Sequence, residues 1–177
     1  MANTIHNFAS ALRESARPNQ FSVEISFPSF VADAAGHGRD STYLVKSATI
    51  PEVTIEDITL MYRGRQYHEA GEKTFQPWTC TIYNSANFAI RTALEEWANG
   101  IQQSTSIGGV TIPTQYKTDI LIKHLNRNGT VLREYKLIGA YPTTIGQIQL
   151  DYESGNQVET FDVTFTYDYF VSDKRVG

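Results

Sequence analysis

Four histidines and one cysteine are the side chains best suited to bind a metal ion or to act as a nucleophile. The histidines, His6, His37, His68 and His124, are scattered, and none stands at ligand spacing from another histidine, from Cys80 or from a pair of carboxylates. Cys80 is the only cysteine, which excludes a disulfide within the chain and a multi-cysteine zinc site. It lies in a strand-like run, where a cysteine is usually a small core residue. The pattern predicts no metal site and no cofactor.

The segment PSFVADAAGHGRDS (residues 28–41) holds a hydroxyl, a base and an acid in Ser41, His37 and Asp40. A catalytic triad needs such groups on a rigid scaffold, and this segment lacks the strand, turn and helix of a nucleophile elbow. It also lacks the lysine and the helix start of a phosphate-binding loop. Because it is rich in glycine and alanine and has no period, we predict a mobile loop, and no enzyme.

Length and composition indicate one globular domain, residues 1–177. The chain is 41% hydrophobic and 19% charged, and its 15 basic and 19 acidic residues give a formal net charge of −4. An acidic balance disfavours adhesion to DNA or to anionic lipid. Residues 1–18 lack the pattern of a signal peptide, and no apolar run approaches the roughly 20 residues that span a bilayer. We therefore expect no membrane association.

Helical periodicity appears in two places. Residues 1–18 predict an N-terminal arm with a short helix that starts at Thr4. A longer helix is predicted over about residues 85–101, capped by Asn84 or Ser85 and ended by Gly100 in a left-handed conformation. Their apolar faces are Ile5, Phe8 and Leu12, and Ile90, Leu94, Trp97 and Ile101, respectively.

The final third of the chain predicts long amphipathic strands. VETFDVTFTYDYFV (residues 158–171) alternates strictly and is expected to form one strand of more than about 40 Å. GQIQLDY (residues 146–152) is expected to pair with it. The polar face of the two has carboxylates and no lysine or arginine, and consists of Gln147, Gln149, Asp151, Thr160, Asp162, Thr164, Thr166 and Asp168. From the residues alone, this polar composition is explained at least as well by a face that is simply exposed to solvent.

The centre of the chain predicts a long β-hairpin over about residues 53–83. Its segment TLMYRGRQYHEAGEKTFQPWTCTIYN (residues 59–84) places two strand-like runs around a charged centre. The apolar parity shifts between Ile55 and Ile58, which predicts a β-bulge there. With one long helix among strands, the chain is expected to be mainly β (α+β): an antiparallel β-sandwich or barrel-like domain with one flanking α-helix and a long protruding hairpin.

Several short motifs occur in a specific order: RPNQFSVEISFP, SATIPEVTI, YRGR, AGEKTF, TIYN and FAIRTALEEWANGI. This series resembles the tail tube proteins of contractile-tailed bacteriophages, from Arg17 to near the end of the chain. The resemblance implies six copies closing into a ring, with strands forming a continuous barrel around a lumen, and rings stacking into a hollow tube. It also implies that the hairpin reaches the adjacent ring through Tyr62, Arg63, Gly64, Arg65, Glu69, Gly71, Glu72 and Lys73.

The resemblance further implies the partners and the location. They are other copies of the chain, the tail sheath, baseplate and tail terminator proteins, and, inside the lumen, the tape measure protein and DNA that passes without specific binding. The expected location is the virion tail, assembled in the host cytoplasm. The polar face of the C-terminal strands then suits the lumen, because DNA must slide past it. Two alternatives remain open: the tube of an R-type bacteriocin or a type VI secretion system, and a β-barrel module that binds a peptide or small ligand.

Overall fold

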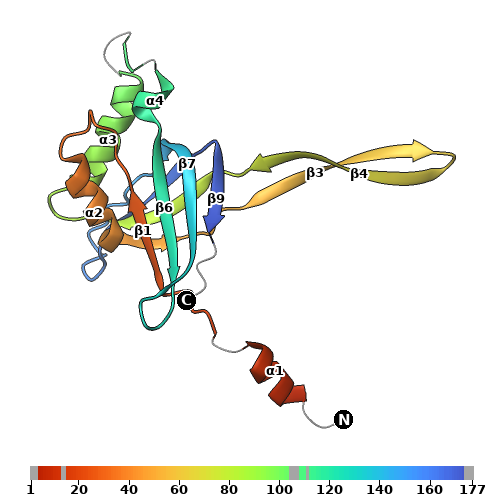
Figure 1. Ribbon diagram of the computed structural model, residues 1–177. Coiled ribbons are helices and arrows are strands. Elements are labelled where there is room, and N and C mark those ends of the chain that lie inside the picture. Colours follow the sequence, from red (N-terminus) through yellow and green to blue (C-terminus); the bar gives the residue numbers. More distant parts are fainter. Residues whose placement is uncertain (1–3, 13–14, 104–107, 111, 174–177) are drawn as a thin grey trace.

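The computed structural model describes residues 4–12, 15–103, 108–110 and 112–173. A body of strands and helices carries a long two-stranded hairpin that projects to one side (Figure 1). None of the helices in these ranges is long and apolar enough to cross a membrane. The mainly β, antiparallel architecture with an unclosed sheet confirms the predicted fold class.

The body is one antiparallel network in which the longest strand, β7, belongs to two sheets. The first half of β7 pairs with β6 and β9, which with β1 form sheet I, in the order β1–β6–β7–β9. The second half pairs with β8, which with β5 and β2 forms sheet II, in the order β7–β8–β5–β2. The strands are β1 (Phe21–Ile25), β2 (Val45–Ala48), β5 (Trp78–Tyr83), β6 (Thr118–Leu125), β7 (Val131–Ile145), β8 (Thr160–Thr166) and β9 (Tyr169–Asp173).

Two glycines shape β7. Gly129 has a φ of 78° in the turn between β6 and β7, and the dipeptide Asn128-Gly129 is a sequence signal for such a hairpin turn. Gly139 has a φ of 69° where β7 passes from sheet I to sheet II, and a Cβ atom there would collide with the Asp168 carboxylate. Glycine is therefore required where the strand changes sheets.

The helix α3 (Ala89–Ile101) packs on the core through the predicted residues Ile90, Leu94 and Trp97, all buried. The Trp97 ring centroid lies 5.7 Å from that of Phe27 and 6.1 Å from that of Phe165. Its Nε1 donates to the Tyr116 carbonyl oxygen at 2.8 Å, so the indole fills the core with its polar atom satisfied.

The predicted start of this helix and its predicted caps were wrong, although it ends at Ile101 as expected. It begins at Ala89 after Phe88, which has a φ of 53°, because the Asn84 amide is bonded to Glu159 instead of capping a helix. Gly100 is helical, and the helix ends at Ile101 with Gln102 extended. Gly100 is small for another reason: a Cβ atom there would overlap the Phe30 ring.

The predicted loop at residues 28–41 was also wrong in its second half, which is the helix α2 (Ala34–Leu44). Its glycines are a packing feature, since a Cβ atom on Gly38 would lie 3.2 Å from the Ile25 carbonyl oxygen. The buried Ser41 hydroxyl accepts a hydrogen bond from the Ile25 amide at 3.0 Å and donates to the Gly38 carbonyl at 2.7 Å. Tertiary contacts with β1 thus outweigh a poor helix propensity.

The single C-terminal strand predicted over residues 158–171 is two strands. Tyr167 and Asp168 separate β8, which pairs in sheet II, from β9, which pairs with β7 in sheet I. Residues 146–152 form no strand; they begin a loop that joins β7 to β8. Alternation persists through all of these segments, so periodicity alone does not reveal where the chain leaves one sheet for the other.

The predicted hairpin consists of β3 (Val53–Tyr62) and β4 (Arg65–Phe75), and the remainder of the 53–83 segment is β5 of the body. The register shifts between Ile55 and Asp57, where a bulge was predicted. Ile55 pairs with Lys73 and Asp57 pairs with Ala70, which is a step of two residues on β3 and of three on β4. The extra residue of the bulge therefore lies on β4. The bulge therefore does not bring Ile55 and Ile58 onto one face.

Two short helices complete the described chain. The arm helix α1 (Thr4–Leu12) confirms the predicted N-terminal helix, and its apolar residues are exposed. The helix α4 (Pro113–Tyr116), which starts with proline, was not predicted. Residues 104–107 and 111, which precede it, lie outside the described residues.

Candidate assembly surfaces

The hairpin tip is a two-residue turn that displays two arginines. Tyr62 pairs with Arg65, and between them Arg63 and Gly64 both have positive φ, 49° and 81°, as a type I′ turn requires. The Arg63 guanidinium lies 5.2 Å from the centre of the Tyr62 ring, a cation–π distance. All four residues are exposed, so the tip presents the positive charge of Arg63 and Arg65 with the aromatic surface of Tyr62 beside it.

The outer half of the hairpin has two unlike faces. Ile58, Leu60, Tyr62 and Tyr67 share one face and are all exposed. On the other face, His68 Nδ1 lies 2.7 Å from Asp57 Oδ2, and the Thr59 hydroxyl donates to the same oxygen at 3.1 Å. Met61 is also on this second face. An exposed apolar stripe opposite a polar network is typical of a surface that a partner covers.

The inner half of the hairpin joins the core. The Phe75 ring lies 5.6 Å from that of Phe170 on β9, and Lys73 Nζ is 5.2 Å from the centre of the Phe75 ring. Glu72 lies at the register shift, beside Gly71, whose Cβ would be only 2.9 Å from the Glu56 carbonyl. Glu69 pairs with Ile58 farther out. The charged residues predicted to act together are thus spread from tip to base.

Sheet II has one core face and one hydroxyl-rich face. On the latter, the Thr81 hydroxyl donates to Asp162 at 2.6 Å, and the hydroxyls of Thr79 and Thr164 lie 3.0 Å apart. Thr160 and Thr166 share the face by strand alternation. We call this the threonine face; its members are Ser47, Thr79, Thr81, Thr160, Asp162, Thr164 and Thr166.

Three of the seven members of the threonine face, Ser47, Thr79 and Thr81, were not predicted from the sequence. Thr79 and Thr81 alternate with buried Trp78, Cys80 and Ile82, and this alternation was the available signal. What the sequence did not reveal is that β5 is the direct partner of β8.

A lysine also reaches this face, contrary to the expectation that it lacks cations. Lys46 Nζ lies 5.6 Å from the centre of the Tyr83 ring, beside the pair that Tyr83 forms with Thr160.

Four of the predicted lumen residues lie elsewhere. Gln147, Gln149 and Asp151 are in the loop before β8. Asp168 lies in the break after β8, where its carboxylate binds Lys117 Nζ at 2.6 Å. This contact raises the pKa of Lys117 above its ordinary value. The regular face ends with Thr166.

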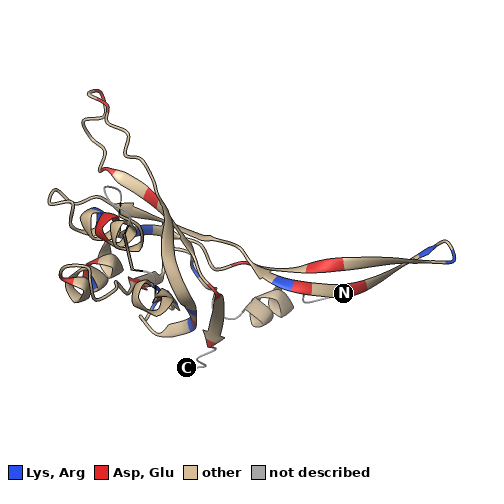
Figure 2. Cartoon of the chain, turned by 90° about the horizontal axis from the view of Figure 1, so that it is seen from above, with Lys and Arg blue, Asp and Glu red and all other residues tan. Residues whose placement is uncertain are grey.

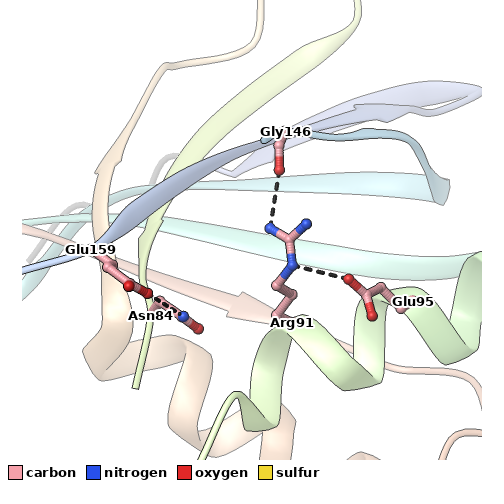
Figure 3. Close-up of polar contacts among 5 residues, drawn as sticks. All are labelled: Asn84, Arg91, Glu95, Gly146 and Glu159. Atoms are coloured by element: carbon pink, nitrogen blue, oxygen red, sulfur yellow. Dashed lines mark hydrogen bonds and ion pairs between the residues drawn. The ribbon is translucent and has the colours of Figure 1, made fainter. Parts of the chain in front are cut away.

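Both ends of the loop between β7 and β8 are clamped (Figure 3). The side-chain Nδ2 of Asn84 donates to Glu159 Oε2 at 2.8 Å. The backbone N–H of Asn84 donates to the backbone carbonyl of Glu159 at 2.9 Å. Arg91, from the first turn of α3, donates through NH1 to the Gly146 carbonyl at 3.0 Å and through Nε to Glu95 at 2.9 Å. The loop is therefore held at its base and exposed over residues 149–158.

Sheet II ends in strands that have a partner on one side. Within the described ranges, β2 pairs with β5 alone, and the second half of β7 pairs with β8 alone. Their outer edges carry backbone donors and acceptors that invite pairing with another strand.

The side chains suited to chemistry do not converge. Among the described residues, no group of three or more His, Cys, Asp or Glu side chains is placed to hold a metal ion. Burial raises the pKa of the Cys80 thiol to about 12, so the thiolate needed for nucleophilic attack is disfavoured. The Ser41 hydroxyl is bonded to the backbone amide of Ile25 on β1 and to the backbone carbonyl of Gly38 on α2. The exposed features of the described chain that are suited to contact with a partner are its hairpin, the open edges of sheet II and the loop between β7 and β8.

The chain is similar in sequence to known phage proteins. The sequence profile described as "Phage tail tube protein" matches residues 16–173. Tail tube protein gp19 of Enterobacteria phage T6 is 32% identical over 157 residues, covering 88% of this chain and 90% of that protein. The tail tube protein of Serratia phage KSP90 is 28% identical, covering 97% and 98%.

Solved structures share the fold. The tube-terminating cap of the anti-feeding prophage has a TM-score of 0.66 at 19% identity, covering 92% of this chain and 93% of that one. The profile match and the identity to the phage proteins carry the assignment: the chain belongs to the phage tail tube protein family, whose members are structural proteins of the tail.

Proposed function

We propose that this chain is the repeating subunit of a phage tail tube, in which six copies close into a ring through sheet II. The observation that carries the proposal is the pair of open edges on β2 and on the second half of β7. The four strands of sheet II alternate in direction, so β2 of one copy is antiparallel to β7 of the next copy around a ring axis. Each copy then adds four strands to one closed antiparallel barrel, which removes both edges.

The threonine face would line the lumen of that barrel. The opposite face is filled by Trp78, Phe161 and Phe165, which pack in the core of the subunit and leave the hydroxyl side for the interior of the ring. Threonine hydroxyls that bond to one another or to Asp162 bind phosphate weakly. Asp162 adds a negative charge, which opposes tight binding of DNA. Such a wall would let DNA move through the tube during ejection.

The hairpin would connect successive rings. Its apolar stripe, Ile58, Leu60, Tyr62 and Tyr67, has no cover in the isolated subunit. A two-stranded ribbon of this length is marginal alone, so contact with another ring would stabilise it. The charged positions from Arg63 to Lys73 would set the register of that contact.

The tube would lie in the virion tail, after assembly in the host cytoplasm. Its exterior would contact the sheath, its ends the baseplate and the tail terminator, and its lumen the tape measure protein and then DNA. One of the similar structures is a contractile injection system described as a sheath-tube complex, which supports a sheath partner here (TM-score 0.62, 18% identity). The tube of a headless injection system shares this fold, but the sequence relatives at 28–32% identity are phage proteins and favour the phage.

Electron microscopy of the purified chain tests the proposal. We expect six-fold rings at low concentration and hollow tubes at high concentration. Light scattering that shows a monomer over a wide concentration range would refute ring formation and would favour a β-barrel binding module.

A further inference from the structure

We infer that the loop between β7 and β8, residues 147–159, is the receptor for the hairpin tip of a second copy in the next ring. The inference rests on the proposed stacking of rings and names the surface that the hairpin meets. It is supported by the positions of the two elements, by their charges and by their exposed apolar side chains.

The two elements leave sheet II at opposite ends. The hairpin departs where β2 ends and β5 begins, at the end marked by the pair Trp78 and Phe165. The loop departs where β7 ends and β8 begins, at the end marked by the pair Tyr83 and Thr160. If sheet II lines the tube, stacking brings the hairpin end of one ring against the loop end of the next.

The hairpin and the loop project away from different sides of the body, as Figures 1 and 2 show. The tip of one subunit therefore meets the loop of another subunit and not its own. A contact between two different surfaces of the same chain repeats indefinitely, which is what a growing tube requires.

The charges are complementary. The tip, residues 61–67, contains Arg63 and Arg65 and no carboxylate, whereas residues 147–159 contain Asp151, Glu153 and Glu159 and no lysine or arginine. Figure 2 shows basic residues at the end of the hairpin and acidic residues on the projecting loop. Opposite charge on the two surfaces favours this pairing and disfavours tip-to-tip or loop-to-loop contact.

Apolar side chains accompany both sets of charges. Leu150, Tyr152 and Val158 are exposed on the loop, and Tyr152 is fully so. At the tip Tyr62 and Tyr67 are exposed. The loop also encloses a hollow lined by its own residues from Gln147 to Thr160. Aromatic anchors entering a hollow with a charged rim are characteristic of a specific protein contact.

The clamps at the base of the loop fit a receptor. Asn84, which precedes α3, holds Glu159, and Arg91, in the first turn of α3, holds Gly146. A segment without regular secondary structure is thus fixed at both ends. Such anchoring lowers the entropy cost of ordering the loop when the tip binds.

A charge exchange tests the inference. The variants are Arg63→Glu with Arg65→Glu in the hairpin, Asp151→Lys with Glu153→Lys in the loop, and all four substitutions together. Like charges then face each other in the first two variants and opposite charges in the third. We expect the fraction of protein in sedimenting tubes to fall at least about tenfold in each double variant. In the quadruple variant we expect it to recover to within about twofold of wild type.

A matched control and a folding measurement accompany this exchange. Arg39→Glu with Arg127→Glu makes the same change in net charge as the hairpin variant, at exposed sites outside the hairpin and loop, and should leave tube formation unchanged. Melting followed by circular dichroism should show that every variant folds. If the wild-type chain forms tubes and the loop variant also forms full-length tubes, the inference is overturned and the proposed function is left intact. A wild-type chain without tubes would overturn both.

Disulfide trapping gives a readout that does not depend on charge. Copies with Tyr62→Cys are mixed with copies with Tyr152→Cys, assembled into tubes and oxidised; Cys80 is buried and should not compete. Crosslinked dimers should form in tubes and not in isolated rings. A pair of Tyr62→Cys with Ser10→Cys on α1 serves as control. Tubes in which the first pair gives no more crosslink than the control would overturn the inference.

Discussion

The body and the hairpin of this chain are built from the same alternation of apolar and polar residues, and they use it in opposite ways. In β5 and β8 the apolar residues are buried among one another, with Ile82, Val163 and Phe165 inaccessible to solvent. In β3 and β4 the equivalent residues, such as Leu60 and Tyr67, are exposed. The body therefore contains its own core, whereas the apolar face of the outer hairpin is left uncovered within one chain.

The difference indicates where stability and assembly are encoded. Burial of apolar surface contributes about 25 cal/mol of stability per Å² removed from water, and the body gains this within one chain. In the proposed tube, the exposed apolar stripe of the hairpin would obtain the same stabilisation from a neighbouring copy. Substitutions in the body should then change the free energy of unfolding, and substitutions in the hairpin should change tube formation.

The largest effect on folding is expected from Trp97→Ala. The Trp97 ring is fully buried between Phe27 and Phe165, and its loss removes apolar burial and leaves a cavity. We expect the free energy of unfolding to fall by about 3–5 kcal/mol. Chemical denaturation followed by circular dichroism measures it. Trp97→Phe, which keeps most of the ring, should cost less, and an unchanged stability of the alanine variant would show that α3 does not pack as described.

A smaller effect is expected from Ser41→Ala. The Ser41 hydroxyl is the acceptor for the buried Ile25 amide, and its removal leaves that amide without a partner. We expect a loss of about 1–3 kcal/mol in the free energy of unfolding. Ser10→Ala, on the exposed arm helix, is the control and should change stability by less than about 0.5 kcal/mol. Equal effects of the two substitutions would contradict the link between α2 and β1.

The sequence predicted the parts of this fold that depend on local pattern. The hairpin, α3 and the β6–β7 turn follow from alternation, from the 3.6-residue period of Ile90, Leu94 and Trp97, and from Asn128-Gly129. It failed where tertiary contact decides. The helix α2 is helical because Gly38 and Ser41 fit against β1, and the break at Tyr167 and Asp168 exists because β7 changes sheets there.

The same limit applies to the candidate surfaces. The charged centre of the hairpin was visible in the sequence, but the turn at Arg63 and Gly64 was not singled out there. The threonine face was partly visible, because Thr164 and Asp162 alternate within one segment. Their partners Thr79 and Thr81 lie more than 80 residues away along the chain. Strand order joins them, and strand order is not a local property.

Cys80 makes the stability of the body depend on pH. The folded body raises its thiol pKa from about 9 to about 12. The folded state thus keeps a proton that the unfolded state releases above pH 9, so stability should fall as the pH rises from about 9 towards 12. Cys80→Ala should weaken this slope, measured by thermal melting at several pH values. At pH 8 a thiol reagent should label Cys80 only in denaturant, and rapid labelling of native protein would contradict its burial.

The smallest effect on folding, and the sharpest separation of the two regions, is expected from neighbouring hairpin residues. Leu60 lies on the apolar stripe and Met61 on the opposite face, and their exposed fractions are 48% and 67%. Because both are exposed, Leu60→Ser and Met61→Ser should each change the free energy of unfolding by less than about 0.5 kcal/mol.

Tube formation should distinguish them: Leu60→Ser removes apolar surface that the next ring would cover and should reduce tubes strongly, whereas Met61→Ser should leave them near wild type. Negative-stain microscopy at matched concentrations gives the comparison. Equal tube yields from the two variants would mean that the stripe is not the contact, and a loss of melting temperature in Leu60→Ser would mean that the hairpin belongs to the folding unit of the body.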